Sequence, residues 1–220
     1  MQYHISSTPQ ELGQEAARAF VDLYNQAVQD RGIFTVALSG GSTPVHLYKA
    51  LAQTDLDWSR VRFYFSDERT VPADHKDSNY KTAKDNFFDG VGIQPEHVFR
   101  MEGELDPQEA ASRYAAVLPD QLDLCYLGMG DDGHTASLFP DTEALTASGR
   151  VVANFVPKLN TWRITFTFEE INRSRNIHIL ATGANKKEVL LEVKNKSGKH
   201  PIEGVENPFW YVDAAIAELL

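Results

Sequence analysis

Short apolar runs alternate with longer amphipathic segments along most of the chain. The apolar, β-rich runs predict strands at Ile33–Leu38, Val61–Phe65, His97–Met101, Leu122–Leu127, Val151–Val156, Trp162–Phe168 and Ile177–Ala181. Apolar residues at helical spacing predict helices at Gln10–Asp30, Val45–Ala52, Asn79–Phe88, Pro107–Leu118, Ala184–Val193 and Val212–Leu220. Strands separated by helices are typical of βαβ units. The pattern therefore predicts the α/β class, with a mostly parallel sheet flanked by helices.

One of these strands has a different pattern. In Trp162–Phe168, Ile164, Phe166 and Phe168 alternate with polar residues, whereas strands buried in a parallel sheet are apolar throughout. We therefore expect an edge or antiparallel strand here. The 220 residues contain no internal repeat, low-complexity tract or flexible linker, so a single domain over 1–220 is expected.

Three polar turns each follow a predicted strand. They are Ser39–Pro44, Ser66–Tyr80 and Gly128–His134. Ligands of open α/β sheets bind at the carboxyl ends of the strands, so we expect all three turns to lie on one rim of the sheet.

The third turn carries candidate acid–base chemistry. Glycines follow the apolar run Leu122–Leu127, and then come Asp131, Asp132 and His134, near which we expect a helix to begin. A histidine oriented by a nearby carboxylate is typical of a general base.

The glycines of this turn also match the G-x-G-x-x-G dinucleotide fingerprint. That motif requires an acidic residue at the end of the next strand to bind the ribose, and Val151–Val156 has none. Asp131 and Asp132 would also repel the pyrophosphate that binds at such a helix terminus. The sequence therefore argues against a dinucleotide cofactor, and we expect none.

The first turn is a candidate phosphate-binding loop. Its glycines expose backbone N–H groups and its hydroxyls add donors, which makes candidates of Ser39, Gly40, Gly41, Ser42 and Thr43. Pro44 suits the first position of a helix. No lysine follows the glycines, so this is not a Walker loop. A tight turn with a good helix cap remains an equal alternative.

The second turn contains Arg69, which could bind a phosphate or stabilise an oxyanion. Asp67, His75 and Asn79 are further candidates for a pocket, although the cluster could also be a solvated loop with ion pairs. After Ile177–Ala181, two lysines lie in the first turn of a predicted helix, where they oppose the helix dipole. They indicate a nearby anion, or else they are simply exposed.

Charge and cysteine content narrow the function classes. A net charge of −10 argues against nucleic acid or an anionic membrane as a partner. The first thirty residues lack the basic and apolar regions of a signal peptide, and no apolar run is long enough to span a membrane, so we expect neither element. Cys125 is the only cysteine, so no internal disulfide is possible, and it lies in an apolar strand. We expect a cytoplasmic location. The sequence contains neither an H-E-x-x-H motif nor paired Cys/His spacing, so we expect no metal site.

The three turns, taken together, are specific enough to indicate a protein family. ALSGGSTP, SDERTVPADHKDSNY and LGMGDDGHTASLFP, in this order and spacing, resemble the lactonase branch of the glucosamine/galactosamine-6-phosphate isomerase family. The resemblance continues through Arg163–Asn172 and Ala181–Leu190. It implies a modified Rossmann-like fold without metal or cofactor. It also implies hydrolysis of 6-phospho-D-glucono-1,5-lactone to 6-phosphogluconate, in the pentose phosphate pathway.

The resemblance also assigns expected roles. His134 would be the base that activates water, Asp132 would orient it, and Arg69 would stabilise the oxyanion or orient the substrate. The phosphate would bind the first turn with Lys186 and Arg163. Which of Arg69 and Lys186 contacts the phosphate stays open. The expected partner is a small sugar-phosphate lactone, and the chain is expected to be a monomer or small homo-oligomer.

Two alternatives remain. The first is glucosamine-6-phosphate deaminase or isomerase activity, which Phe139 and Arg69 disfavour, since deaminases typically have Glu and Tyr there. The second is a non-catalytic sugar-phosphate sensor, which the intact Asp132 and His134 disfavour.

Overall fold

The computed structural model describes residues 1–220, and its centre is a six-stranded sheet in which every pair of neighbours is parallel. The strands, in spatial order, are β1 (Gln2–Ser6), β9 (Phe209–Asp213), β8 (Ile177–Ala181), β5 (Leu124–Gly128), β2 (Phe34–Leu38) and β3 (Val61–Phe65). All residues of β2 and β8 are buried, as expected for strands covered on both faces. The predicted α/β class and mostly parallel sheet are confirmed.

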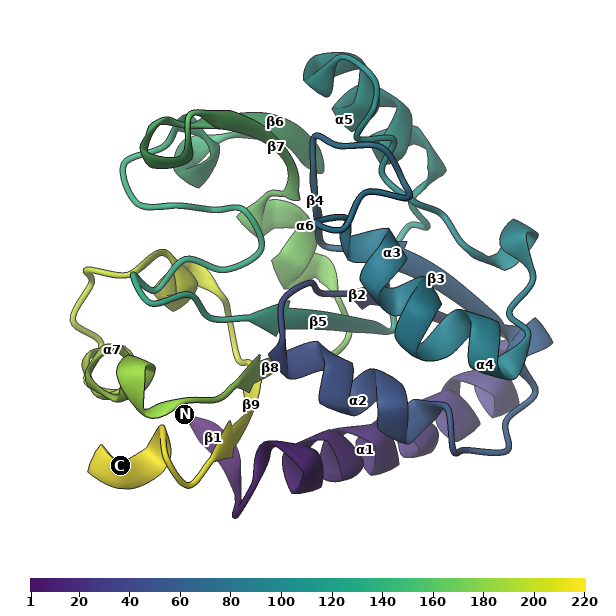
Figure 1. Ribbon diagram of the computed structural model, residues 1–220, viewed down its shortest axis with the longest axis horizontal. Helices are drawn as coiled ribbons and strands as arrows, with labels where there is room; N and C mark the ends of the chain where they lie inside the picture. Colours follow the sequence, from purple (N-terminus) through teal and green to yellow (C-terminus); the bar gives the residue numbers. More distant parts are fainter.

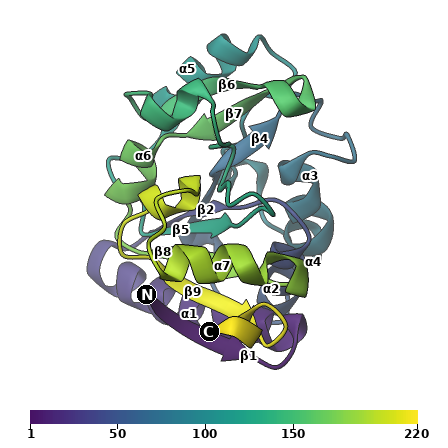
Figure 2. The same ribbon diagram turned by 90° about the vertical axis from the view of Figure 1, so that its left-hand side faces the viewer.

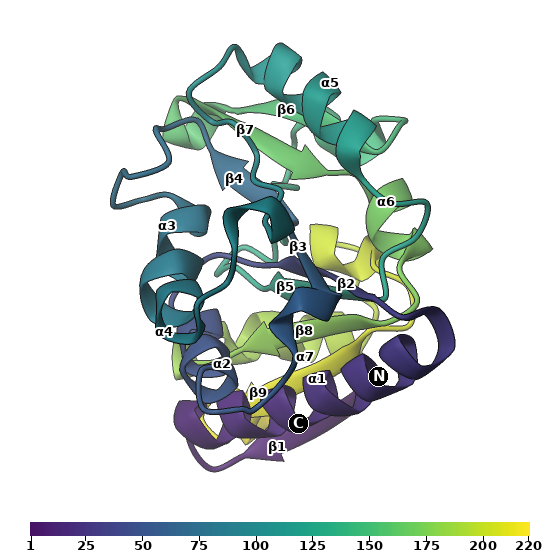
Figure 3. The ribbon, with the colours of Figure 1, turned by 90° about the vertical axis from the view of Figure 1, so that its right-hand side faces the viewer.

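One face of the sheet is covered by α1 (Pro9–Arg31) and α2 (Thr43–Leu51), with α3 (Asn79–Ala83) and α4 (Asp89–Val91) beside them (Figure 3). Thr8 caps α1 by accepting a hydrogen bond from the Glu11 N–H, and the helix ends at Gly32 in the left-handed region. The two long helices pack closely because Gly13 has no side chain. A Cβ there would overlap the backbone of His46.

The other face is covered by α5 (Pro107–Val117), α6 (Phe168–Arg173) and α7 (Lys187–Lys194). Figure 2 shows α7 lying across the lower part of the sheet, near β8 and β9. Trp210 of β9 is buried on this side, in the same apolar cluster as Leu190 of α7. The two faces together enclose the core and leave the strand ends open.

A second, antiparallel sheet stands beside the first (Figure 1). Its order is β4 (Asp67–Arg69), β7 (Thr161–Phe166) and β6 (Val151–Val156). Backbone hydrogen bonds connect the sheets through Ser66, which donates to Leu38 O at 2.9 Å and accepts from Phe166 N at 2.8 Å. The predicted antiparallel character of Trp162–Phe168 is confirmed, although the strand is central in its sheet and α6 begins at its predicted end.

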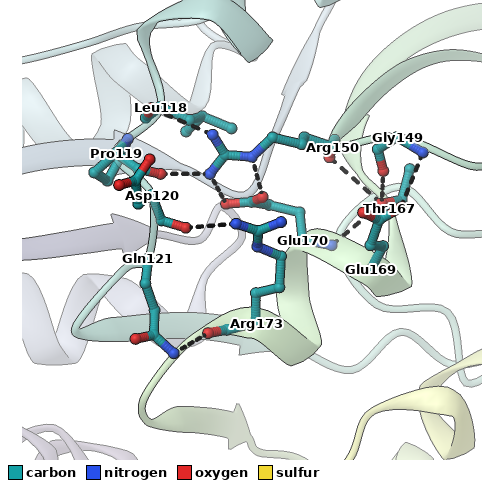
Figure 4. A network of polar contacts seen from close by, with 10 residues as sticks. All are labelled: Leu118, Pro119, Asp120, Gln121, Gly149, Arg150, Thr167, Glu169, Glu170 and Arg173. Atoms are coloured by element: carbon teal, nitrogen blue, oxygen red, sulfur yellow. Dashed lines mark hydrogen bonds and ion pairs between the residues drawn. The ribbon is translucent and has the colours of Figure 1, made fainter.

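A buried ion pair connects three segments around this second sheet (Figure 4). Two guanidinium nitrogens of Arg150 donate to the Glu170 carboxylate at 2.5 and 2.8 Å. The same guanidinium donates to the carbonyls of Leu118 and Pro119, just after α5. The Glu170 side chain is only 1% exposed. The pair therefore joins the start of β6, the first turn of α6 and the end of α5.

Several predicted elements are corrected. The predicted helix Val212–Leu220 is instead the end of β9 and a short 3-10 turn, because its first residues pair with β8 and β1. His97–Met101 is not a strand, since only Val98 bridges to Phe63. The predicted loop after β3 contains β4, and β1 was not predicted.

The remaining predicted elements are confirmed with shifts of a few residues. Asn79–Phe88 is helical but loosens into a π-helical turn at Lys84–Phe88, and Ala184–Val193 begins with a 3-10 turn at Ala184–Lys186. Cys125 is free and buried, and burial raises the pKa of its thiol well above the usual range. No helix has the length and apolar character required to cross a bilayer.

Candidate active site

The three polar turns meet in one pocket of about 210 Å³ at the carboxyl ends of β2, β5 and β8. Residues from the first turn, the second turn and the third turn all line it, together with Lys186. The lining is largely polar, in contrast to the apolar faces of the sheet. The arrangement brings together most of the candidate residues, which were separated by up to 147 positions along the chain (186 − 39).

His134 lines the pocket, and Asp132 contacts it from outside the lining. Asp132 Oδ1 lies 2.6 Å from His134 Nδ1 and also accepts a hydrogen bond from the His134 backbone N–H at 3.1 Å. With Nδ1 held by the carboxylate, Nε2 is the nitrogen left for a ligand. Carboxylate contact at Nδ1 fixes the ring orientation and its tautomer. The geometry is that of an oriented general base.

No helix begins at His134, which corrects the prediction. The chain from Asp131 to Pro140 stays irregular because Gly133 (φ 74°) and Ala136 (φ 47°) are in the left-handed region, which interrupts a right-handed helix. Other parts of the molecule satisfy its polar groups: the Thr135 hydroxyl donates to Gly128 O at 2.8 Å. The segment is held by tertiary contacts rather than by a helix.

Two further side chains contact the pair. Lys158 forms an ion pair with the second carboxylate oxygen of Asp132, and the Phe139 ring stacks on the imidazole of His134 with centroids 4.0 Å apart. Partial burial raises the pKa of Asp132, but hydrogen bonds from Lys158 and His134 outweigh it and lower the pKa to about 2. The carboxylate is therefore ionised at neutral pH.

The first turn has the features of an anion-binding loop. Gly41 has φ 95°, and Ser42, the N-cap of α2, makes no side-chain capping bond. Tyr48 of α2 holds the loop, since its hydroxyl donates to Ser39 O at 2.5 Å. The Thr43 hydroxyl shares a 2.8 Å hydrogen bond with that of Thr182, beyond β8. The Ser42 hydroxyl and the backbone N–H groups of Gly41 and Ser42 thus remain for a ligand.

The second turn is organised by Glu68, a buried carboxylate. It accepts hydrogen bonds from the backbone N–H groups of Arg69, Asn79 and Tyr80, all between 2.8 and 2.9 Å, and from the Ser78 hydroxyl at 3.1 Å. Burial raises the pKa of Glu68, and these backbone hydrogen bonds oppose that rise. Glu68 therefore fixes the course of the loop from β4 to α3.

Asp67 and Asn79 form a polar wall of the pocket. The Asn79 carboxamide donates to the Asp67 carbonyl at 2.9 Å and to its carboxylate at 3.1 Å, and the Ser137 hydroxyl donates to the other carboxylate oxygen at 2.7 Å. Asp67 and Asn79 both line the pocket. These contacts join the second turn to the segment that follows His134.

Two cations face the pocket without a carboxylate partner. Lys186 makes no ion pair and no side-chain hydrogen bond, whereas its neighbour Lys187 is paired with Glu218. Arg69 donates from Nη1 to Asp77 O at 2.6 Å, and its Nε is buried with no partner. Unpaired cations in a chain of net charge −10 indicate that this pocket binds an anion.

Three candidates lie outside the lining of the pocket: Asp132, which contacts it through His134, and also Arg163 and His75. Arg163 is directly opposite Arg69 in the pairing of β7 with β4, and burial together with the charge of Arg69 lowers the pKa of its guanidinium. His75 accepts a hydrogen bond from the Asp77 N–H at 3.2 Å, within the exposed loop. The structure therefore places His75 as a support of the loop.

Lys158 is the residue that sequence reasoning missed. It lies in the turn between β6 and β7, 26 positions from Asp132, and no motif surrounds it. Ser137 was also missed: it lies within the LGMGDDGHTASLFP motif, but its partner Asp67 is 70 positions away. The pairing of β6 with β7 was the only available signal, since it brings the turn to the rim. No group of three or more His, Cys, Asp or Glu side chains comes together to hold a metal ion.

Comparisons with known proteins agree with this geometry. The family model described as "Glucosamine-6-phosphate isomerases/6-phosphogluconolactonase" matches residues 7–213. A 6-phosphogluconolactonase of Synechocystis is 40% identical over 179 residues, which cover 76% of this chain and 74% of the relative. One of Chlamydia pneumoniae is 36% identical, with 90% and 82% covered. The crystal structure of 6-phosphogluconolactonase from Thermotoga maritima superposes with a TM-score of 0.88 at 27% identity, covering 96% and 99%, which confirms the Rossmann-like fold.

Proposed function

Because the chain belongs to the glucosamine-6-phosphate isomerase/6-phosphogluconolactonase family, we propose that it hydrolyses 6-phospho-D-glucono-1,5-lactone to 6-phosphogluconate. The observation that carries this proposal is that His134, oriented by Asp132, lines the same pocket as Arg69 and Lys186, which have no carboxylate partner. An oriented base and an anion-binding pocket are what hydrolysis of a phosphorylated lactone requires. We include a cytoplasmic location in the proposal.

The first step is attack by water on the lactone carbonyl. Nε2 of His134 removes a proton from the water as its oxygen bonds to C1, and the carbonyl electrons move to the oxygen. Asp132 stabilises the imidazolium that forms, through its 2.6 Å contact with Nδ1. A lactone is an activated ester, so no covalent intermediate with the protein is needed.

The second step is collapse of the tetrahedral intermediate. The carbonyl re-forms, the bond from C1 to the ring oxygen breaks, and the imidazolium of His134 returns its proton to that oxygen. The product is an open-chain acid that ionises in water. Arg69 stabilises the oxyanion between these steps, since it lines the pocket and has no carboxylate partner.

The 6-phosphate binds on the other side of the pocket. The Ser42 hydroxyl, the backbone N–H groups of Gly41 and Ser42, and the Lys186 ammonium supply donors there. Arg163, which we expected to bind the phosphate, is paired with Arg69 on the β4 side and outside the lining, so it adds only its charge to the pocket. The division of roles follows from position: Arg69 lies on the β4 side, and Lys186 follows β8.

The experiment that tests the proposal measures lactone hydrolysis directly. The lactone is generated by oxidation of glucose 6-phosphate with its dehydrogenase, and residual lactone is measured as its hydroxamate. A blank without the protein corrects for spontaneous hydrolysis. We expect a rate far above the blank. A rate equal to the blank would overturn the proposal, and ammonia release from glucosamine 6-phosphate would instead establish the deaminase alternative.

A substitution in the first turn tests the role of the anion loop. A Cβ at Gly40 would overlap the carboxamide of Asn79, so Gly40→Ala must displace Asn79 and the Asp67 carboxylate that it holds. We expect kcat/KM to fall roughly ten- to hundredfold, because small displacements of a binding group are costly. Gly90→Ala is the control: nothing lies within 4 Å of the added Cβ there, and activity should not change. Equal activity in both variants would contradict the role of this loop.

A further inference from the structure

We propose that Lys158, at the tip of the β6–β7 hairpin, is a positioning residue for this reaction: it holds the Asp132 carboxylate and keeps the His134 imidazole unprotonated at lower pH. The inference rests on the proposed function. It starts from the ion pair between Lys158 and Oδ2 of Asp132, which no sequence motif predicts.

The hairpin turn gives Lys158 a defined place. Val156 pairs with Thr161, so the turn consists of residues 157–160. Pro157 begins a 3-10 turn, and Asn160 ends it in the left-handed region (φ 47°, ψ 46°), with its N–H donating to Pro157 O at 3.0 Å. A proline and a left-handed asparagine restrict both ends of the turn. The ammonium therefore extends from an ordered backbone.

Lys158 completes the contacts of the Asp132 carboxylate. Oδ1 faces His134, and Oδ2 faces the Lys158 ammonium. The same ammonium lies 4.8 Å from the centroid of the Phe139 ring, and that ring stacks on the imidazole. The two contacts restrict rotation of the carboxylate. Because the carboxylate orients the imidazole, Lys158 acts on His134 without touching the substrate.

The positive charge of Lys158 opposes protonation of the His134 imidazole. A carboxylate next to an imidazole favours the imidazolium, and a protonated imidazole is not a base. A cation on the other oxygen of the carboxylate opposes that effect. Other ionisable groups nearby are Lys186, Arg69 and Asp67, which line the pocket, and Asp131, which accepts a hydrogen bond from Asn185 at 2.9 Å. His200 also lies close, with Nδ1 3.2 Å from Asp132 O and Nε2 2.7 Å from Glu192. They remain unchanged when Lys158 alone is replaced.

The test is the pH dependence of kcat/KM in three variants, from pH 5.5 to 8. In Lys158→Met we expect the acidic limb to move to higher pH by roughly 0.5 to 1 unit. The loss of activity should then be largest near pH 5.5 and small near pH 8. Lys158→Glu should move the acidic limb to still higher pH. Lys158→Arg keeps the positive charge, so its acidic limb should stay at the wild-type pH. Lys84→Met is the control, because it removes a lysine from an exposed pair with Asp89.

A second readout separates this inference from the proposed function. The His134 imidazole resonance, assigned by its absence in His134→Asn, is titrated in the wild type and in Lys158→Met. We expect its midpoint to rise in the variant. If the wild type hydrolyses the lactone but neither the limb nor the midpoint moves, the role of Lys158 is refuted and the function stands. If the lactone is not hydrolysed but the midpoint rises, the function fails and the coupling of Lys158 to His134 stands. A loss of rate that is equal at every pH would show a merely structural role.

Discussion

Replacing His134 with asparagine is expected to lower kcat/KM for the lactone by about 10²–10⁴-fold, the range typical of a lost general base. Asparagine retains a side chain of similar size but cannot accept a proton from water at neutral pH. The Asp132 carboxylate would keep its contact with Lys158 and so would not be left without a partner. The measurement is initial lactone hydrolysis, corrected for the blank, in parallel with the wild type.

The effect should be confined to the chemical step. Binding of 6-phosphogluconate, measured by calorimetry, should change little, because Arg69, Lys186 and the first turn remain. His4→Asn is the matched control, since His4 is exposed on β1 and makes no hydrogen bond. Near-normal turnover in His134→Asn would rule out the proposed base, whereas loss of product binding would point to misfolding of the turn.

The largest expected loss of stability follows from replacing Arg150 with methionine. The substitution leaves the Glu170 carboxylate buried at 1% exposure without its cation, and removes the donors to Leu118 O and Pro119 O. Breaking a buried ion pair in this way costs about 3–5 kcal/mol of the free energy of unfolding. Urea unfolding, followed by fluorescence and circular dichroism, measures it, and the two probes together test whether the transition is two-state.

Two further variants show whether the loss arises from the uncompensated charge. In Arg150→Met/Glu170→Leu both charges are absent, and much of the lost stability should return, as when buried pairs are replaced by apolar residues. Arg113→Met breaks the exposed pair with Glu109 and should cost at most about 1 kcal/mol. An Arg150→Met variant as stable as Arg113→Met would contradict the importance of the buried pair.

Much of the central sheet could be predicted because its strands are buried on both faces. Residues 177–181 and 61–65 are apolar enough to be assigned with correct bounds. β1 could not be predicted in this way, because four of its five residues are exposed and it forms only by pairing with β9. β4 has the polar sequence DER, which reads as a loop until β7 lies beside it. Such edge and short strands are determined by tertiary pairing.

The prediction for β9 was wrong because a helical periodicity was assigned to residues that include the end of a strand. Val212, Ile216 and Leu220 have helical spacing, and this outweighed the strand-like Phe209–Val212. In the candidate site, Asp132 and His134 were predictable because their partnership is local. Lys158 was not, because its contact depends on the path of a hairpin that no local pattern describes.

The pairing of β1 with β9 has a consequence for synthesis of the protein on the ribosome. β1 is made first of the nine strands, and its one neighbour in the sheet is made last. Roughly 200 residues separate them, which takes on the order of 10 to 40 s at usual elongation rates. Until then β1 has no partner, and the edge of β8 that β9 will cover has unpaired backbone groups. During translation β1 is therefore without its partner for most of the time, whereas the β8 edge is unpaired only while the segment between β8 and β9 is made. We expect chaperones to bind β1 in nascent chains of this protein.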